Sequence, residues 1–442
     1  MNDLYIESVV VRKLNVRILL FLMICYFVSI LDRVNISVAS LTMNEALNFS
    51  PAVYGFGAGI FFVGYFIFEV PSNIILHRVG APLWIARIMV TWGIITICML
   101  LVFNSISFFS IRFLLGVAEA GFYPGVIYYL SRFYPLSHRT KAIGLFQIAS
   151  PVALMIGSPL IGLILGLHGA LGLQGWQLIF LLTGIPAVLL GVICYFYLKP
   201  SIGKLKWLTP KERDWLENQL QSENENKPFG HLKFYHVFAK RQVWLATFLL
   251  FAINVGFNGV AFWTPQIIKS IGTGSNLMAS VLTGIPYLVA AVSVVLVSRH
   301  SDKTGERKLH VLFCLLASGM GFLLSSQATH PFIMLTGLSI ATAGLLSAMP
   351  PLWTFPIGMF SGVAAATAIA TINSFGVLGG IVGPNILGFV TNATGRISSG
   401  LVVVAAFLIA GSIGSLFLKV TGNTHAGESA LQAESGVIIA NK

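Results

Sequence analysis

The sequence predicts an all-α membrane protein of twelve transmembrane helices, built as two homologous six-helix halves. Its 442 residues are 56% hydrophobic and only 10% charged, whereas soluble domains carry about 25% charged residues. A chain of this composition cannot cover itself with polar surface, so lipid is its expected solvent. Apolar runs long enough to cross a hydrocarbon core of about 30 Å recur along the whole chain.

The apolar runs form two groups of six on either side of a polar interruption. We therefore expect an N-terminal half at 1–198, a linker at 199–242, a C-terminal half at 243–420 and an unstructured cytoplasmic tail at 421–442. The run at 356–391 is too long for one straight span, so part of it must be loop or a tilted end. The expected spans are 17–40, 53–77, 82–103, 107–131, 140–167, 176–198, 243–270, 277–298, 309–327, 331–353, 356–391 and 398–418.

The basic residues lie in alternate loops, which accounts for the net charge of +12 without any nucleic-acid partner. Cytoplasmic loops of membrane proteins carry an excess of lysine and arginine. We therefore expect both termini and the linker to face the cytoplasm, in a bacterial inner membrane. Asp32 and Arg33 interrupt the first apolar run, so we interpret it as a retained helix rather than a cleaved signal peptide.

The linker contains one segment with helical character. Thr209 can cap a helix, Pro210 can occupy its first turn, and Trp215 and Leu216 fall on one face. This pattern predicts a short amphipathic helix at the membrane surface.

Four ionisable residues lie inside apolar runs: Asp32 and Arg33 in the first span, and Arg112 and Glu119 in the fourth. A charge at the centre of a bilayer costs at least about 2.5 kcal/mol on insertion scales, so each needs a partner or a function. Arg112 and Glu119 are seven residues apart, two helical turns, and therefore share a helix face.

Two interpretations of these charges stay open. They could be two structural ion pairs, Asp32 with Arg33 and Glu119 with Arg112, or the arginines could bind an anion beside carboxylates that carry protons. We favour the second, because buried ion pairs are weak stabilisers. The C-terminal spans offer polar and aromatic groups instead of charges. Candidate substrate contacts besides the arginines are Tyr65, Gln147, Asn254, Asn258, Trp353 and Asn373.

Other charged residues lie near span ends, where a gate is expected. Glu69 should pair with Arg78 or Arg87 at the end of the second span. In the loop after the eighth span, Gly305 supplies a tight turn between Asp302 and Arg307.

Several of these segments resemble a known family. The loop "SDKTGERK" is similar to the loop motif of the major facilitator superfamily. The segments "LDRVNISVA", "RFLLGVAEAGFYPGVIYYLSRFYP" and "FWTPQIIK" resemble its anion:cation symporter branch. One departure is His77, which stands where the superfamily usually has an aspartate between the second and third spans.

The resemblance implies proton-coupled uptake of a small organic anion, such as a dicarboxylate, a sugar acid or an aromatic acid, by alternating access. It assigns Asp32 and Glu119 as the proton-coupling pair, and Arg33 and Arg112 as the arginines that bind the anion. No cofactor is expected besides the proton gradient, and the protein should be a monomer. The alternative is a multidrug or metabolite exporter of the same fold. No nucleophile–base set, metal cluster or phosphate loop indicates an enzyme.

Overall fold

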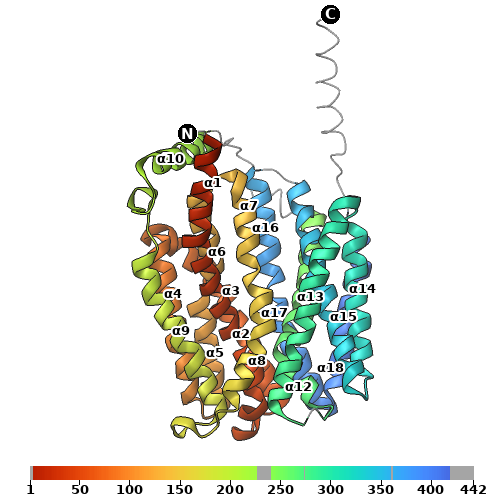
Figure 1. The fold of residues 1–442 in the computed structure, drawn as a ribbon. Helices are drawn as coiled ribbons and strands as arrows, with labels where there is room; N and C mark the ends of the chain where they lie inside the picture. Colours follow the sequence, from red (N-terminus) through yellow and green to blue (C-terminus); the bar gives the residue numbers. More distant parts are fainter. Residues whose placement is uncertain (1–2, 226–239, 273, 360–361, 419–442) are drawn as a thin grey trace, which may run out of the picture.

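The computed structural model describes residues 3–225, 240–272, 274–359 and 362–418, and these ranges form a bundle of long helices (Figure 1). Within them, twelve helices are long and apolar enough to cross a membrane. The predicted fold class is therefore confirmed. The expected tail at 421–442 and the part of the linker at 226–239 lie outside the described residues.

The N-terminal half holds the first six spans, and one of them is much longer than a membrane crossing requires. The first span runs without interruption from Tyr5 to Ala46, because a short π-helical turn, Asn15–Leu19, joins two α-helices. The helices of this half are α1 (Asp3–Leu14), α2 (Leu20–Ala46), α3 (Pro51–Val79), α4 (Ala81–Cys98), α5 (Ser105–Glu119), α6 (Phe122–Phe133), α7 (Leu136–Gln147), α8 (Ala149–Leu165) and α9 (Gly175–Tyr197).

The C-terminal half supplies the other six spans. The run at 356–391 is not one straight span, as predicted. Its first residues end α15, and its described residues from 362 onward lie mostly in α16 and α17, which together contain the span Thr367–Thr394. The helices of this half are α12 (Arg241–Lys269), α13 (Asn276–Thr304), α14 (Lys308–Ser326), α15 (Pro331–Met359), α16 (Gly362–Gly376), α17 (Gly379–Thr394) and α18 (Ile397–Ser415).

The fourth span is broken in the middle, which the sequence analysis did not anticipate. α5 ends at Glu119, and α6 begins at Phe122 after Gly121, whose φ of +90° suits a residue without a side chain. The Ser72 hydroxyl donates a hydrogen bond of 2.7 Å to the Ala120 carbonyl oxygen. A carbonyl group near the break therefore has a partner, as a membrane interior requires.

One end of the bundle, here called the linker end, carries α1 and the predicted linker helix α10 (Pro210–Glu225) (Figure 1). Thr209 and Glu212 cap α10 reciprocally: the Thr209 N–H donates to Glu212 Oε2, and the Glu212 N–H donates to Thr209 Oγ1. Lys13 Nζ lies 2.7 Å from Glu212 Oε2 and joins α10 to α1. Glu7 Oε1 lies 2.7 Å from His138 Nε2 of α7, and Glu223 forms an ion pair with Arg139.

At the other end of the bundle, here called the opposite end, the two halves are in close contact. α3 packs against α17, α8 against α13, and α2 against α12. Gly55 and Gly388 allow the backbones of α3 and α17 to touch, since a Cβ on Gly388 would lie 2.6 Å from the Pro51 carbonyl oxygen. The Tyr54 hydroxyl donates to the Phe262 carbonyl oxygen at 2.6 Å. The opposite end is therefore closed.

We expect Gly388→Val to push α3 and α17 apart and to favour a conformation that is open at the opposite end. Spin labels at Leu171 and Phe332, exposed residues of the two halves at this end, should move apart in distance measurements. Gly144→Val is the matched control, because no atom lies within 4 Å of a Cβ built there. An unchanged distance distribution in Gly388→Val would contradict the assignment of this contact as the closure.

The Lys13–Glu212 pair should contribute stability that depends on pH. Partial burial opposes ionisation of Glu212, but hydrogen bonds from Lys13 and Thr209 outweigh it and lower its pKa below the ordinary value of 4.5. A carboxyl group with a lowered pKa stabilises the fold at neutral pH, and this contribution disappears as the pH falls through the lowered pKa. Lys13→Gln should therefore cost about 0.5–1 kcal/mol at pH 7, as exposed ion pairs do.

The measurement is thermal unfolding in detergent at pH 7 and below pH 4, where the difference from wild type should shrink. Lys211→Gln, at an exposed position of the same helix, is the control. Equal destabilisation at both pH values would show that Lys13 acts through packing alone.

Candidate functional site

Arg33 and Glu119 form an ion pair between α2 and α5 in the middle of the N-terminal half. Arg33 Nη2 donates to Glu119 Oε1. The Glu119 side chain is 3% exposed, whereas that of Arg33 is 25% exposed. Ser29, one turn before Arg33 on α2, donates a second hydrogen bond to Glu119 Oε1 at 3.0 Å. The carboxylate is thus enclosed, while the Arg33 side chain is partly exposed.

Arg33 also keeps an unused hydrogen-bond donor. Its buried Nε has no hydrogen-bond partner among the described residues. A guanidinium grips a carboxylate with two parallel N–H donors, so this geometry leaves capacity for an additional anion.

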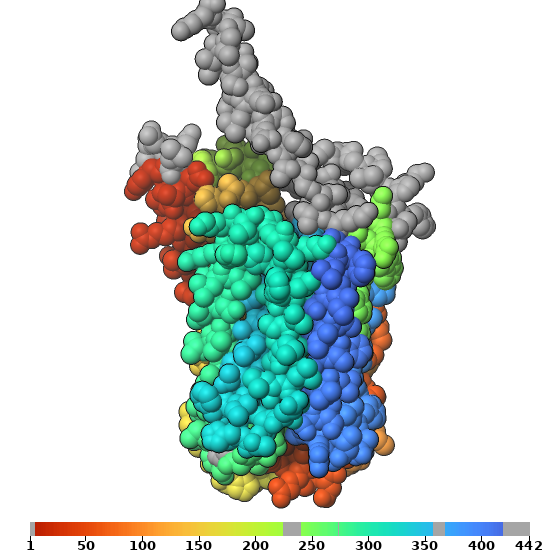
Figure 2. All heavy atoms as spheres, turned by 90° about the vertical axis from the view of Figure 1, so that its right-hand side faces the viewer, coloured from red at the N-terminus to blue at the C-terminus, as the bar shows by residue number. Residues whose placement is uncertain are grey.

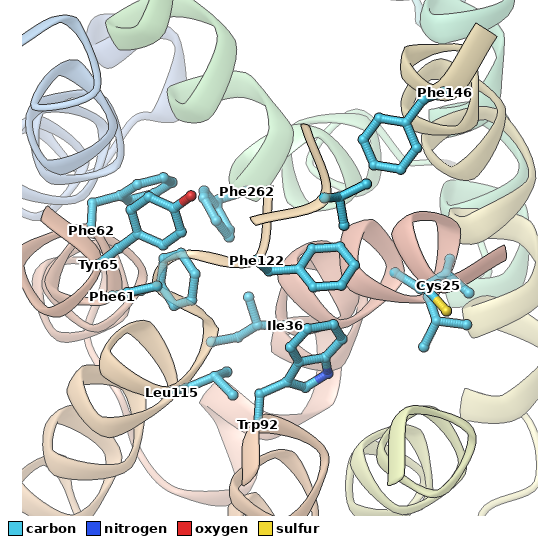
Figure 3. Packing of buried hydrophobic residues seen from close by; sticks show 14 of the residues in the cluster. Cys25, Ile36, Phe61, Phe62, Tyr65, Trp92, Leu115, Phe122, Phe146 and Phe262 are labelled. Atoms are coloured by element: carbon cyan, nitrogen blue, oxygen red, sulfur yellow. The ribbon is translucent and has the colours of Figure 1, made fainter. Parts of the chain in front are cut away.

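Aromatic side chains surround this guanidinium. The Arg33 guanidinium carbon lies 5.3 Å from the ring centre of Phe61 and 5.5 Å from that of Tyr65. Figure 3 shows Phe61, Phe62 and Tyr65 of α3 gathered near Phe262 of α12. Rings at these distances attract a cation while excluding water. Where water is excluded, the attraction between the arginine and an anion is stronger than it would be in water.

Arg112 lies elsewhere, against the closed end of the bundle. It is 1% exposed, and it donates to the carbonyl oxygens of Gly57 and Ala58 on α3 at 3.2 and 3.4 Å. Its guanidinium carbon lies 5.1 Å from the Phe61 ring and 5.9 Å from that of Phe262 in the other half. The Phe61 ring therefore lies within 6 Å of both guanidinium groups.

Asp32 faces away from Arg33 and into the N-terminal half. It is 2% exposed. Its Oδ2 accepts a hydrogen bond of 2.9 Å from Trp92 Nε1 on α4, and its Oδ1 lies 3.4 Å from Asn35 Nδ2. Neighbouring positions on α2 thus send an acid and an arginine in different directions.

The structure corrects the expected pairing of these charges. The sequence suggested that Asp32 is balanced by Arg33, and Glu119 by Arg112. Instead Arg33 binds Glu119, and among the described residues Asp32 and Arg112 form no ion pair. The reason is geometric, because consecutive residues of a helix point about 100° apart. Spacing within one helix also cannot show what a neighbouring helix presents.

Gln147 of α7 contacts Tyr123 of α6, which in turn packs against Tyr26 of α2. Its Nε2 donates to the Tyr123 hydroxyl at 2.7 Å, and the Tyr123 ring centre lies 5.7 Å from that of Tyr26. The Gln147 side chain is itself exposed. It lies at the end of α7, where α8 begins two residues later.

The C-terminal candidates form a looser group. Asn258 Nδ2 lies 3.3 Å from Asn254 Oδ1 on the same helix, and Asn254 Nδ2 donates to the Leu250 carbonyl oxygen. Trp353 on α15 and Asn373 on α16 are half-buried. The helices that carry these four residues pack against one another, since α12 contacts both α15 and α16. The structure records no direct contact between these side chains and Arg33.

The expected ion pair of Glu69 is absent from the described part of the chain. Glu69 is paired with neither Arg78 nor Arg87; Arg87 instead lies 4.1 Å from the ring centre of Trp84. In the C-terminal half, Arg307 Nη1 lies 2.7 Å from Asp302 Oδ1. Gly305, with φ of +69°, ends α13 between them.

Sequence reasoning missed the neutral partners of the buried charges: Ser29, Asn35, Trp92 and Thr183, and the tyrosines Tyr26 and Tyr123. Polar residues on an apolar helix were the available signal, but nothing in the sequence shows which helices face each other. A groove of about 620 Å³ between α13, α14 and α15 lies apart from all these residues, on the side of the C-terminal half that faces the viewer in Figure 2.

The chain is similar to known transporters over nearly its whole length. A protein of Agrobacterium vitis named "Putative tartrate transporter" is 45% identical over 425 residues, which cover 96% of this chain and 98% of that protein. A "Quinolone resistance transporter" of Acinetobacter baumannii is 38% identical over 92% of this chain and 94% of its own length.

A crystal structure of a bacterial homologue of the human lysosomal transporter Spinster, described as inward-facing and occupied, shares the fold. Its TM-score is 0.75 at 17% identity, over 92% of this chain and 97% of that one. The sequence model of the Major Facilitator Superfamily matches residues 22–384. This match covers most of the twelve spans, so the chain is a membrane transporter, not an enzyme, and belongs to the Major Facilitator Superfamily.

Proposed function

We propose that the protein carries a small organic anion, with one or more carboxylates, together with protons into the cell. The observation that carries this proposal is the Arg33–Glu119 pair, in which a partly exposed arginine keeps a free donor beside an enclosed carboxylate. The name of the Agrobacterium vitis relative supports a tartrate-like dicarboxylate as the first substrate to test.

The coupling follows from charge balance. With no substrate bound, Arg33 and Glu119 neutralise each other. An anion that binds Arg33 would leave the Glu119 carboxylate without its counter-charge in an apolar interior, which is strongly unfavourable. A proton on Glu119 restores neutrality, so anion and proton assist each other's binding, and this assistance is reciprocal.

Alternating access would then move the loaded site from one side of the membrane to the other. The contacts at the opposite end keep that side closed in this conformation, and the basic loops at the linker end favour a cytoplasmic location for it. We propose the Asp302–Arg307 pair as part of a gate in the C-terminal half, and Asn254, Asn258, Trp353, Asn373 and Gln147 as neutral contacts that select among anions.

Export of a drug or metabolite is the second candidate, favoured by the name of the Acinetobacter baumannii relative and by the aromatic residues around Arg33. Uptake into proteoliposomes distinguishes the two. Tartrate and a panel of other carboxylates should accumulate when an inward proton gradient is imposed, and not without it. Extrusion of fluoroquinolones, with no carboxylate accumulation, would replace the proposal with the exporter.

Arg33→Lys should weaken tartrate binding at least tenfold, because an ammonium lacks the planar fork that binds a carboxylate bidentately. Replacing two charge-assisted hydrogen bonds by one costs on the order of 1.5–3 kcal/mol. The measurement is competition of unlabelled tartrate with labelled tartrate on the purified protein. Arg132→Lys, at an exposed arginine over Tyr128, should bind as wild type. Unchanged affinity in Arg33→Lys would exclude Arg33 as the anion ligand.

Glu119→Gln mimics the protonated carboxyl group and frees Arg33. We expect it to bind and exchange tartrate across the membrane but to lose accumulation against a gradient. Counterflow and gradient-driven uptake in the same proteoliposomes separate the two activities. Glu45→Gln, at an exposed position on α2, should keep both. Normal accumulation by Glu119→Gln would make Glu119 a structural partner only.

A further inference from the structure

The groove on the outer face of the C-terminal half, the face seen in Figure 2, takes no part in the proposed anion site. α13 and α14 both pack against α15, and the space between them has a volume of about 620 Å³. Its floor includes the small residues Ala343 and Gly344 of α15, and its walls include Val289 of α13 and Phe313 of α14. Ligand sites have volumes of about 300–1,000 Å³, so the groove is large enough for one.

The groove occupies only the part of the bundle nearest the linker end. α13 runs from the opposite end to the linker end, where it ends at Thr304 (Figure 1). The residues of α13 that line the groove lie between Val289 and Thr304. From Val289 to His300 the helix rises roughly 16 Å, about half of a hydrocarbon core of about 30 Å. The groove therefore has the length of one leaflet of the bilayer.

Apolar side chains line most of this length, and polar ones gather at the linker end. Ser293 Oγ, one turn from the inner end, lies 3.0 Å from Ser347 Oγ and is thereby satisfied. At the linker end, His300 Nδ1 lies 2.8 Å from His310 Nε2. The other ring nitrogen of His310, Nδ1, is buried without a hydrogen-bond partner among the described residues. An apolar trough with an incompletely bonded polar end fits an amphiphile better than a water-soluble molecule.

The loop at this polar end has a positive charge. The segment 299–308 carries four basic and two acidic residues, a net charge of +2. Both acids are already engaged: Asp302 pairs with Arg307, and Glu306 Oε1 accepts a hydrogen bond from a backbone N–H at the start of α14. The charge of the loop therefore favours an anionic head group over a neutral or cationic one.

Two lysines lie beside the polar end of the groove. Lys303 follows His300 by three residues, so the two side chains are neighbours on the surface of α13. Lys308 directly precedes Leu309, which lines the groove. Neither lysine forms an ion pair with another described residue. Both are therefore available to a phosphate group.

We propose that this groove binds one anionic phospholipid from the leaflet at the linker end. One acyl chain lies between α13 and α14 on the floor of α15. The phosphate lies at the polar end, where the His300–His310 pair donates a hydrogen bond and Lys303 and Lys308 supply the counter-charge. Because α13 also packs against α8 of the other half, a lipid that holds α13 acts on a helix of the contact between the halves. The site does not depend on which solute is carried.

Native mass spectrometry of the purified protein tests the site, with phosphatidylglycerol as the anionic probe and phosphatidylcholine of the same acyl chains as the zwitterionic one. The wild type should retain one phosphatidylglycerol roughly tenfold or more tightly than phosphatidylcholine. Ala343→Phe fills the floor of the groove and should weaken this retention roughly tenfold or more, because the acyl chain loses its contacts. Ala410→Phe, at an exposed position of α18, is the matched control and should bind as wild type.

Lys303→Gln tests the head-group end separately. It should weaken phosphatidylglycerol binding about fivefold and leave phosphatidylcholine binding unchanged, since a basic residue near the membrane surface contributes about that factor toward an anionic lipid. Lys211→Gln, at an exposed position of α10, is its control and should not change either affinity.

Ala317→Phe, on the α14 wall of the groove, decides the question if Ala343→Phe does not fold. Equal retention of phosphatidylglycerol by the wild type and by the filled-groove variant would overturn the site, as would equal retention of the two lipids by the wild type. Retention of a fluoroquinolone but of no phospholipid would assign the groove to an exported drug. A dimer that Ala343→Phe abolishes would make the groove an interface between copies of the chain. Either of these results would also overturn the proposal.

Discussion

The Arg33–Glu119 pair is the constraint on which the rest of the N-terminal half depends. A single unpaired charge in the middle of an apolar bundle is costly, and the pairing of Arg33 with Glu119 lowers this cost for both residues. α2 and α5 are held at a distance that lets the two side chains meet, with Ser29 completing the shell of Glu119. The break after Glu119 places this carboxyl group at the end of a helix, where the backbone carbonyls carry partial negative charge and favour a nearby cation.

The two halves depend on a different kind of contact. At the opposite end, small residues let α3 and α17 approach until their backbones touch, and neutral hydrogen bonds such as Tyr54 to Phe262 complete the closure. Contacts of this kind are individually weak and can be released together. The Arg33–Glu119 pair lies within one half, so the proposed alternating access could separate the contacts between the halves without moving the two residues of the pair apart.

Much of the fold could be predicted from the sequence, because crossing a membrane requires long apolar runs and separates basic from neutral loops. The buried charges were also visible, since charge in an apolar run is conspicuous. Their partners were not. Asp32 and Arg33 adjoin in sequence but face different helices, and the break at Gly121 depends on the backbone conformation of one glycine. Trp92 gave no signal, because a tryptophan in an apolar run is ordinary until its N–H is found against a carboxylate.

The first span has a mechanical consequence. Its continuous helix covers 42 residues and is therefore roughly 60 Å long, about twice the thickness of the hydrocarbon core. The excess stands out at the linker end, where Lys13 and Glu7 fasten it to α10 and α7. Because this helix is continuous, a small tilt of its membrane-spanning part displaces its N-terminal end by a larger distance. The N-terminal helix thus links a tilt of the first span to the helices at the linker end, α10 and α7.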